Sequence, residues 1–169
     1  MKIFIIGYMA SGKTRFGKRL AAAIDYDFVD LDHLFEEMHG LSPAAFIRKF
    51  GENLFRHEES LVLQENLPDS ESIVIACGGG TPCFHNNIQW MKEEGKVVWL
   101  NIPEEMLFQR LTKQKGDRPM IPQTDGKPDH EKFLKHYKER EKFYAQADFS
   151  FTEAKVEAVL AVLDVYLKS

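Results

Sequence analysis

The sequence predicts an α/β protein in which a parallel sheet is covered by helices on both faces. Five short apolar runs have the pattern of strands buried on both faces: 3–6, 28–29, 73–77, 97–102 and 149–151. Longer segments with helical periodicity separate these runs, and such alternation is typical of a parallel sheet. A chain of 169 residues fits one domain with a core of its own. In this fold class ligands bind at the carboxyl ends of the strands.

Most segments between the strands are expected to be helical. Helices are predicted at about 12–24, in several pieces over 31–66, and at 85–93, 103–113, 129–147 and 153–168. Ser42 followed by Pro43 combines a capping residue with a proline in the first turn, and Pro103 opens a helix in the same way. The last segment carries an apolar stripe at helical spacing, formed by Val156, Val159, Leu160, Leu163 and Leu167.

The segment 115–128 is predicted to be a mobile loop without packed structure. It has few large apolar residues and holds glycine or proline at Gly116, Pro119, Pro122, Gly126 and Pro128. From Arg110 to Lys142 the chain has ten Lys and Arg residues against six Asp and Glu, whereas the whole chain carries a net charge of −4. This basic stretch is a candidate for handling anions, although a solvated helix face would give the same count.

The first strand leads into a phosphate-binding pattern. The residues Gly7-Tyr8-Met9-Ala10-Ser11-Gly12-Lys13-Thr14 match G-x-x-x-x-G-K-[ST] at every fixed position. In such a loop the backbone N–H groups and the following helix start bind phosphate, the lysine reaches the β- and γ-phosphates, and the hydroxyl can ligate Mg²⁺. A chance glycine turn is the alternative, but the strand before and the helix after favour nucleotide binding. The expected nucleotide contacts are Ala10, Ser11, Gly12, Lys13, Thr14 and Arg15.

Asp30 and Asp32 follow the second strand on either side of Leu31. Their side chains share a face if the strand persists. One carboxylate could then support Mg²⁺, while the other binds or deprotonates an acceptor hydroxyl. A helix N-cap is the alternative for this position, and the two roles could belong to different members of the pair.

Arg56 and the triple glycine at 78–80 are candidates for the acceptor site. Arg56 and Glu59 are three residues apart on a predicted helix and can pair, either on the surface or as a carboxylate clamp that Glu59 holds in place. Gly78, Gly79 and Gly80 directly follow a strand, which would let a ligand approach the backbone closely, although a plain loop is the alternative.

Two arginines belong to the basic stretch. Arg118 lies in the predicted loop, where a lid arginine would stabilise charge on a transferring phosphoryl group. Arg140 lies on the next helix and could face the cleft, with Tyr144 one turn further on. A solvated position is the alternative for either arginine.

Composition and missing motifs exclude several classes of protein. Cys77 and Cys83 are too few for a secreted disulfide framework and lack zinc spacing, so two free thiols are favoured over a small disulfide. No apolar run approaches the roughly 20 residues that cross a bilayer, and no signal-peptide pattern is present. The mild acidity argues against general nucleic-acid binding, and the N-K-x-D and D-x-x-G motifs of GTPases are absent. We expect a reduced, cytoplasmic protein.

Together these motifs resemble the shikimate kinase family over nearly the whole chain. Besides the phosphate loop, the elements that carry the resemblance are F-x-D-x-D at 28–32, G-E-x-x-F-R-x-x-E at 51–59, the glycines at 78–80, R-P at 118–119 and R-x-x-x-Y at 140–144. The resemblance implies ATP-dependent phosphorylation of the shikimate 3-hydroxyl, a step toward chorismate and the aromatic amino acids.

The resemblance also implies a single domain with a three-layer α/β/α P-loop kinase fold and a five-stranded parallel sheet. The expected regions are a core at about 1–30, 70–113 and 148–169, a helical substrate-binding region at about 31–66 and a lid at about 114–128. A monomer is expected that binds shikimate as a small-molecule substrate, with no nucleic-acid or membrane partner.

On the nucleotide side, each role follows from a matching position in the family. The resemblance implies that Lys13 binds the phosphates, Thr14 ligates Mg²⁺ and Asp30 supports the metal through water. Arg118 would be the lid arginine at the phosphates, and Arg110 would lie against the adenine.

On the acceptor side, the resemblance implies that Asp32 binds the shikimate hydroxyls and could act as the base. Arg56 and Arg140 would hold the shikimate carboxylate, with a backbone contact from Gly79 between its two neighbouring glycines.

The sequence departs from the family pattern in three places. Ala10 stands where the family often has glycine, the segment 123–128 makes the lid somewhat long, and 152–155 has no match to the adenine-side loop. Two alternatives stay open at this point. A gluconate kinase would share the phosphate loop but has no need for F-x-D-x-D with Arg56 and Arg140. A catalytically silent nucleotide-binding module would tolerate loss of Asp32 or the lid arginine, and neither is lost.

Overall fold

The computed structural model describes residues 1–113, 123–124 and 126–167, and its centre is a five-stranded sheet. The strands, in the spatial order β2-β3-β1-β4-β7, are β2 (Asp27–Asp30), β3 (Ile73–Ala76), β1 (Lys2–Ile6), β4 (Gly95–Leu100) and β7 (Phe149–Phe151). Every neighbouring pair is parallel, and the register places Ile5 opposite Ala76 on one side and Val98 on the other. The predicted five-stranded parallel sheet is therefore confirmed.

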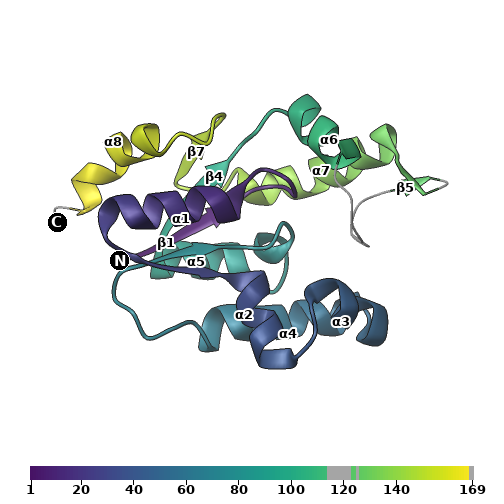
Figure 1. Ribbon diagram of the computed structural model, residues 1–169, viewed down its shortest axis with the longest axis horizontal. Helices are drawn as coiled ribbons and strands as arrows, with labels where there is room; N and C mark the ends of the chain where they lie inside the picture. Colours follow the sequence, from purple (N-terminus) through teal and green to yellow (C-terminus); the bar gives the residue numbers. More distant parts are fainter. Residues whose placement is uncertain (114–122, 125, 168–169) are drawn as a thin grey trace.

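The helices cover the sheet from both sides (Figure 1). In chain order they are α1 (Lys13–Ile24), α2 (Leu31–His39), α3 (Pro43–Phe50), α4 (Glu52–Glu65), the 3-10 turn η1 (Thr81–Cys83), α5 (Asn87–Glu94), α6 (Glu104–Lys113), α7 (His130–Tyr144) and α8 (Val156–Leu167). Figure 1 shows α1 on one side of β1 with α8 beside it, and α5 on the other side. The helices α2, α3 and α4 form a separate group beyond one edge of the core.

Burial follows the apolar patterns of the sequence. In β1 the residues from Ile3 to Ile6 are fully buried, because a central parallel strand has helices over both faces. On α8 the predicted stripe faces the core: Val156, Val159 and Leu163 are buried, and Leu160 and Leu167 pack against them half-buried. Cys77 and Cys83 are free thiols, as predicted. No helix in the described ranges is long and apolar enough to cross a membrane.

Local signals divide the predicted helical pieces of 31–66 into three helices. The Asp30 carboxylate caps α2 by accepting from the backbone N–H groups of Asp32 and His33. The Ser42 hydroxyl caps α3 by accepting from Ala45, and Gly51 separates α3 from α4 with a φ of 88°, which favours glycine.

The structure corrects several expectations about local structure. The loop prediction is wrong for 123–124 and 127–128, where β5 (Gln123–Thr124) and β6 (Lys127–Pro128) form an antiparallel pair, and Gly126 has a positive φ that favours glycine. The residues 114–122 and 125 of the predicted lid lie outside the described residues. The turn η1 was not predicted, and the last helix begins at Val156 rather than at 153.

Candidate active site

The phosphate loop joins β1 to α1 at the carboxyl end of the central strand. Gly7 and Gly12 have φ values of 149° and 90°, which other residues adopt only with strain. A Cβ on Gly7 would lie 2.8 Å from the Leu100 carbonyl oxygen, so the loop passes too close to β4 for a side chain. The sequence pattern thus folds into the strand, loop and helix arrangement that it predicts.

Lys13 is the first residue of α1, and its side chain folds back over this loop. Its Nζ donates to the carbonyl oxygens of Gly7 and Tyr8, both at 2.9 Å. Burial lowers the pKa of Lys13 to about 8, although the nearby Asp32 and Asp30 carboxylates and Cys77 oppose this shift. The surroundings of the Lys13 amine therefore disfavour its charged form, and a bound anion would stabilise that form.

Ala10 adopts a φ of 63°, which is unusual for a residue with a Cβ. Its carbonyl oxygen accepts from Arg110 Nη1 at 2.9 Å, so α6 supports the loop from the side. This contact links two residues expected on the nucleotide side. It also shows that alanine enters the left-handed conformation that the family's more usual glycine would take without strain.

Thr14 and Asp30 face each other across the start of the cleft. The Thr14 hydroxyl donates to Asp30 Oδ2 at 2.5 Å, while Asp30 Oδ1 caps α2. Asp30 thus caps α2 with one oxygen and faces the Thr14 hydroxyl with the other, and its expected support of Mg²⁺ stays a prediction. The premise that the strand continues to Asp32 is wrong, since β2 ends at Asp30. Both carboxylates nevertheless line one cavity.

Asp32 lies on the first turn of α2 and remains exposed toward the cleft. Its pKa is raised to about 6, mainly because the surrounding walls displace water and also because Glu59 and Asp30 repel its charge. Lys13 and Arg56 act in the opposite direction. The carboxylate is therefore ionised at neutral pH but ready to take a proton.

Arg56 is buried, so the surface alternative for its ion pair is wrong. Arg56 Nη1 donates to Glu59 Oε2 at 2.9 Å, and Nε lies 3.4 Å from Glu52 Oε1. The guanidinium lies over the rings of Phe55 and Phe84, at 5.0 and 4.5 Å from their centroids. A planar cation held between rings and a carboxylate is well suited to bind a second carboxylate.

The triple glycine forms the opposite wall of the same cavity. A Cβ on Gly80 would lie 2.4 Å from Arg56 Nη2, and one on Gly79 would lie 3.3 Å from Arg140 Nη1. The Gly79 carbonyl accepts from the Tyr144 hydroxyl at 2.5 Å. These glycines therefore let both arginines approach the backbone, and the expected close approach of a ligand stays a prediction.

Arg140 is also buried and lines this cavity from α7, which rules out a solvated position. Its guanidinium carbon lies 5.9 Å from the centroid of the Tyr8 ring. The Tyr8 hydroxyl lies 2.6 Å from His136 Nδ1, and burial raises the pKa of Tyr8 to about 12 and lowers that of His136 to about 4. Tyr8 thus joins the phosphate loop to α7, a role that its place at a variable position of the motif did not indicate.

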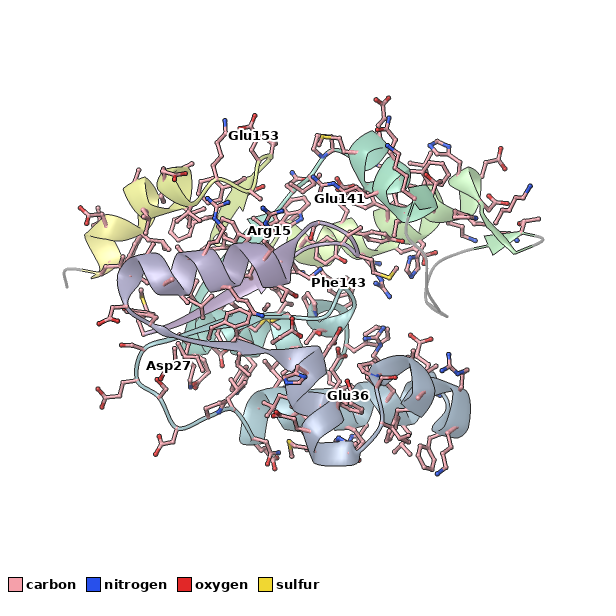
Figure 2. All side chains as sticks on the ribbon, in the orientation of Figure 1. Arg15, Asp27, Glu36, Glu141, Phe143 and Glu153 are labelled. Carbon is pink, nitrogen blue, oxygen red and sulfur yellow. The ribbon has the colours of Figure 1, made fainter. Side chains whose placement is uncertain are left out.

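Two adjoining cavities run through these residues. The first has a volume of about 380 Å³ and the second about 350 Å³. They share Met9, Asp32, Gly78 and Gly79, and Lys13, Thr14 and Asp30 line only the second. A third cavity of about 400 Å³ adjoins the second at Gly12 and Arg15, and Arg110 lies on its wall. Figure 2 shows Arg15 at the loop end of α1.

Sequence reasoning missed the apolar wall of the first cavity. Its residues are Met9, Pro43, Ala44, Ile47 and Phe55. The only available signal was the spacing of Ala44 and Ile47, three residues apart on one helix, and that spacing also suits an ordinary core contact. Arg118 lies outside the described residues, so its expected place at the phosphates stays a prediction.

The comparisons with known proteins agree with this geometry. A family model described as shikimate kinase matches residues 9–169. The chain belongs to the shikimate kinase family. A shikimate kinase from Bacteroides thetaiotaomicron is 36% identical over 160 residues, which cover 93% of this chain and 89% of that protein. The activity that the motifs imply, ATP-dependent phosphorylation of shikimate in aromatic biosynthesis, is therefore confirmed for this enzyme.

Solved structures support the same assignment of the fold. A crystal structure of a Bacteroides thetaiotaomicron shikimate kinase has a TM-score of 0.85 and 32% identity, covering all of this chain and 99% of that one. A shikimate kinase from Acinetobacter baumannii in complex with shikimate has a TM-score of 0.84 and 31% identity, covering 99% and 93%. A gluconokinase from Sinorhizobium meliloti has a TM-score of 0.52 at 15% identity, and so shares the fold alone. The gluconate kinase alternative is thereby disfavoured.

Proposed function

We propose that the two adjoining cavities divide the reaction of this shikimate kinase between an acceptor site and a phosphate site. The observation that carries the proposal is the position of Asp32, which lines both cavities. A group that takes the proton of the acceptor hydroxyl must reach that hydroxyl at the point where phosphoryl transfer begins. Asp32 is the carboxylate that meets this requirement among the described residues.

The first cavity is the proposed acceptor site. Arg56 and Arg140 line it and would hold the carboxylate of shikimate, and the backbone at Gly79 would contact the same ligand. The apolar wall that includes Ile47 and Phe55 would pack against the carbon ring. Both arginines are buried, so they bind a carboxylate with little competition from water.

The second cavity is the proposed site of the phosphates and of Mg²⁺. Thr14 and Asp30 offer two oxygen ligands side by side, which fits an ion that is held by one or two protein oxygens together with phosphates and waters. When bound there, Mg²⁺ would neutralise charge on the phosphates.

The protein groups would then act as follows. Arg56 and Arg140 orient the acceptor, and Asp32 accepts the proton of the 3-hydroxyl as that oxygen attacks the γ-phosphorus. The bond between the γ-phosphorus and the bridging oxygen breaks, and ADP leaves with that oxygen. Lys13 stabilises the negative charge on the transferring group, and Asp32 afterwards releases its proton to water. A carboxylate with a pKa of about 6 suits this role, because it is ionised before the transfer and readily protonated during it.

Several further expectations belong to this proposal. Arg118 would approach the phosphates from the lid, and Arg110 and Arg15 would line the nucleotide base site. We also propose that the enzyme is a cytoplasmic monomer without nucleic-acid or membrane partners and that it forms one domain with its core, acceptor region and lid as the sequence predicts.

Two substitutions test the division of the site. Asp32→Asn is expected to reduce kcat by at least a thousandfold while leaving ATP affinity within about threefold, since general-base catalysis typically contributes 10²–10⁴-fold and the acceptor contact is lost as well. Asp25→Asn is the matched control, because Asp25 is exposed at the end of α1 in a left-handed conformation that asparagine tolerates. Loss of ATP affinity with the Asp32 variant would contradict its place at the acceptor.

Arg56→Ala is expected to raise KM for shikimate at least tenfold and to leave KM for ATP within about twofold, because it removes one cation of the carboxylate clamp. Arg48→Ala on the exposed side of α3 provides the same chemical change outside the cleft. If the Arg56 variant changed only KM for ATP, the carboxylate-clamp role would be wrong.

A further inference from the structure

Thr81 follows the triple glycine and is linked to α4 directly through its hydroxyl and indirectly through its carbonyl oxygen, by way of Asn87 on α5. Its hydroxyl donates to Glu59 Oε1 at 2.6 Å. Its carbonyl oxygen accepts from Asn87 Nδ2 at 2.9 Å. The other end of that amide, Asn87 Oδ1, accepts from Ser60 Oγ and from Gln64 Nε2, both at 2.8 Å. We call these five residues the Thr81 bracket.

Four of the five residues of the Thr81 bracket are closed to solvent, and Gln64 is half-buried at its outer end. Thr81 and Asn87 are fully buried, and Glu59 and Ser60 are buried beside them. Buried polar groups that lose a partner cannot turn to water, so each bond in such a cluster matters more than a surface bond. The orientation of the Asn87 amide is fixed, because its oxygen faces two donors and its nitrogen faces a carbonyl.

The bracket connects the two walls of the acceptor cavity. Arg56, Glu59 and Ser60 recur at helical spacing on one side of α4, and Gly78 to Gly80, which Thr81 directly follows, form the facing wall. Glu59 stands between them, since Oε1 accepts from Thr81 while Oε2 accepts from Arg56. A Cβ on Gly78 would lie 2.9 Å from both Glu59 Oε1 and the Thr81 hydroxyl, so the walls meet without room for a side chain.

From this geometry we infer that Thr81 is a positioning residue for the acceptor. By holding Glu59, its hydroxyl fixes the direction in which Arg56 presents its guanidinium, and through Asn87 the bracket sets the distance between α4 and the glycine loop. Thr81 itself is not among the residues that line the cavity. The inference rests on the proposed role of Arg56 as part of the carboxylate clamp.

The test compares Thr81→Val with Thr81→Ser by steady-state kinetics in both substrates. Valine matches the shape of threonine but leaves Glu59 Oε1 without its donor, so KM for shikimate is expected to rise about tenfold, with KM for ATP within twofold of the unmodified enzyme. Serine keeps the hydroxyl and is expected to restore KM for shikimate to within threefold. Thr112→Val is the matched control, because the Thr112 hydroxyl is exposed and donates to a carbonyl of its own helix.

The remaining outcomes separate this inference from the proposed function. Unchanged KM for shikimate in Thr81→Val, or an equal rise in both KM values, would overturn the positioning role. Arg56→Lys is measured in parallel: if it raises KM for shikimate while Thr81→Val does not, the inference fails and the clamp stands. If Arg56→Lys leaves KM for shikimate unchanged, the clamp assignment and this inference fail together.

A second variant covers the case in which Thr81→Val does not fold. Ser60→Ala removes one of the two donors to Asn87 and leaves Thr81 intact, so KM for shikimate is expected to rise twofold to fivefold with KM for ATP unchanged. An unchanged KM for shikimate in a folded Ser60→Ala protein would overturn the inference.

Discussion

Opposing electrostatic influences set the pKa of Asp32. The walls of the cleft, Glu59 and Asp30 all favour its neutral form, whereas Lys13 and Arg56 favour its ion. The outcome is a pKa of about 6, well above the ordinary value for aspartate. The arrangement that suits the carboxylate to accept a proton therefore also makes its ionised form unfavourable to folding.

The unfavourable ionised form of Asp32 leads to a prediction for the stability of the folded protein. Because the folded pKa is raised, the folded protein holds the Asp32 proton more tightly than the unfolded chain between about pH 4 and pH 6. Stability is therefore lost as pH rises through this window. Asp32→Asn is expected to have a higher Tm than the unmodified enzyme at pH 7.5, and the difference should shrink toward pH 4. Thermal unfolding at several pH values measures it, and a Tm difference that is constant with pH would contradict the raised pKa.

Lys13 gives a second prediction, for ligand binding. Its lowered pKa of about 8 means that part of the enzyme holds a neutral amine at pH 8, and bound phosphates would favour the protonated form. ATP binding at pH 8 to 8.5 should therefore take up protons, and affinity should fall as pH rises above 8. Calorimetry in buffers of different ionisation enthalpy measures the uptake. Lys13→Met should abolish it, and an uptake that persists in this variant would show that another group is responsible.

At the residue scale, the sequence predicts which side chains have a chemical role better than it predicts what packs around them. The phosphate-loop pattern identifies Lys13 and Thr14, and the three-residue spacing predicts the pair of Arg56 with Glu59. Spacing along one helix says nothing about what packs over that helix, so burial of Arg56 against Phe84 could not be foreseen. The contact of Tyr8 with His136 joins residues 128 positions apart, and no local pattern indicates such a pair.

At the scale of elements, apolar periodicity predicts which segments are strands or helices but not where each begins. The run 73–77 becomes β3 at Ile73–Ala76, and the last helix starts at Val156. Ends depend on capping bonds and on neighbours, as the Asp30 cap of α2 illustrates. The pair β5-β6 was missed because its strands have two residues each, too few for an alternating pattern to appear.

The packing of α8 leads to a prediction about stability without loss of binding. Leu163 is fully buried in the core, so Leu163→Ala is expected to lower the free energy of unfolding by about 2–5 kcal/mol. Among the described residues, none that lines a cavity of the site belongs to α8, so KM for either substrate should stay within twofold.

Val165→Ala is the control for that measurement. Val165 lies on the same helix and is 74% exposed, so its loss is expected to change stability by less than about 0.5 kcal/mol. Denaturant unfolding compares the two variants. Equal effects of both substitutions would contradict the docking of α8 through the predicted stripe.

For the whole molecule, the net charge of −4 does not represent the local charges that an anionic ligand meets in the cleft. Lys13, Arg56 and Arg140 come from three different helices and line the adjoining cavities, where burial strengthens each interaction. Arg140 lies in the basic stretch 110–142, so that stretch contributes to the cleft as well as to solvated helix faces. The helices α1, α4 and α7 come together because of the topology of this fold class, which is set by the order of the strands in the sheet.

The central claim is that this cleft transfers phosphate from ATP to the 3-hydroxyl of shikimate. The most direct measurement is the rate of ADP formation with Mg²⁺ and ATP in the presence of shikimate, gluconate or a nucleoside monophosphate, followed by phosphorus NMR of the product. We predict rapid ADP formation with shikimate, at least a hundredfold above the other acceptors, and a phosphate coupled to the proton at carbon 3. No ADP with shikimate, together with turnover of another acceptor or a phosphate at another carbon, would contradict the account.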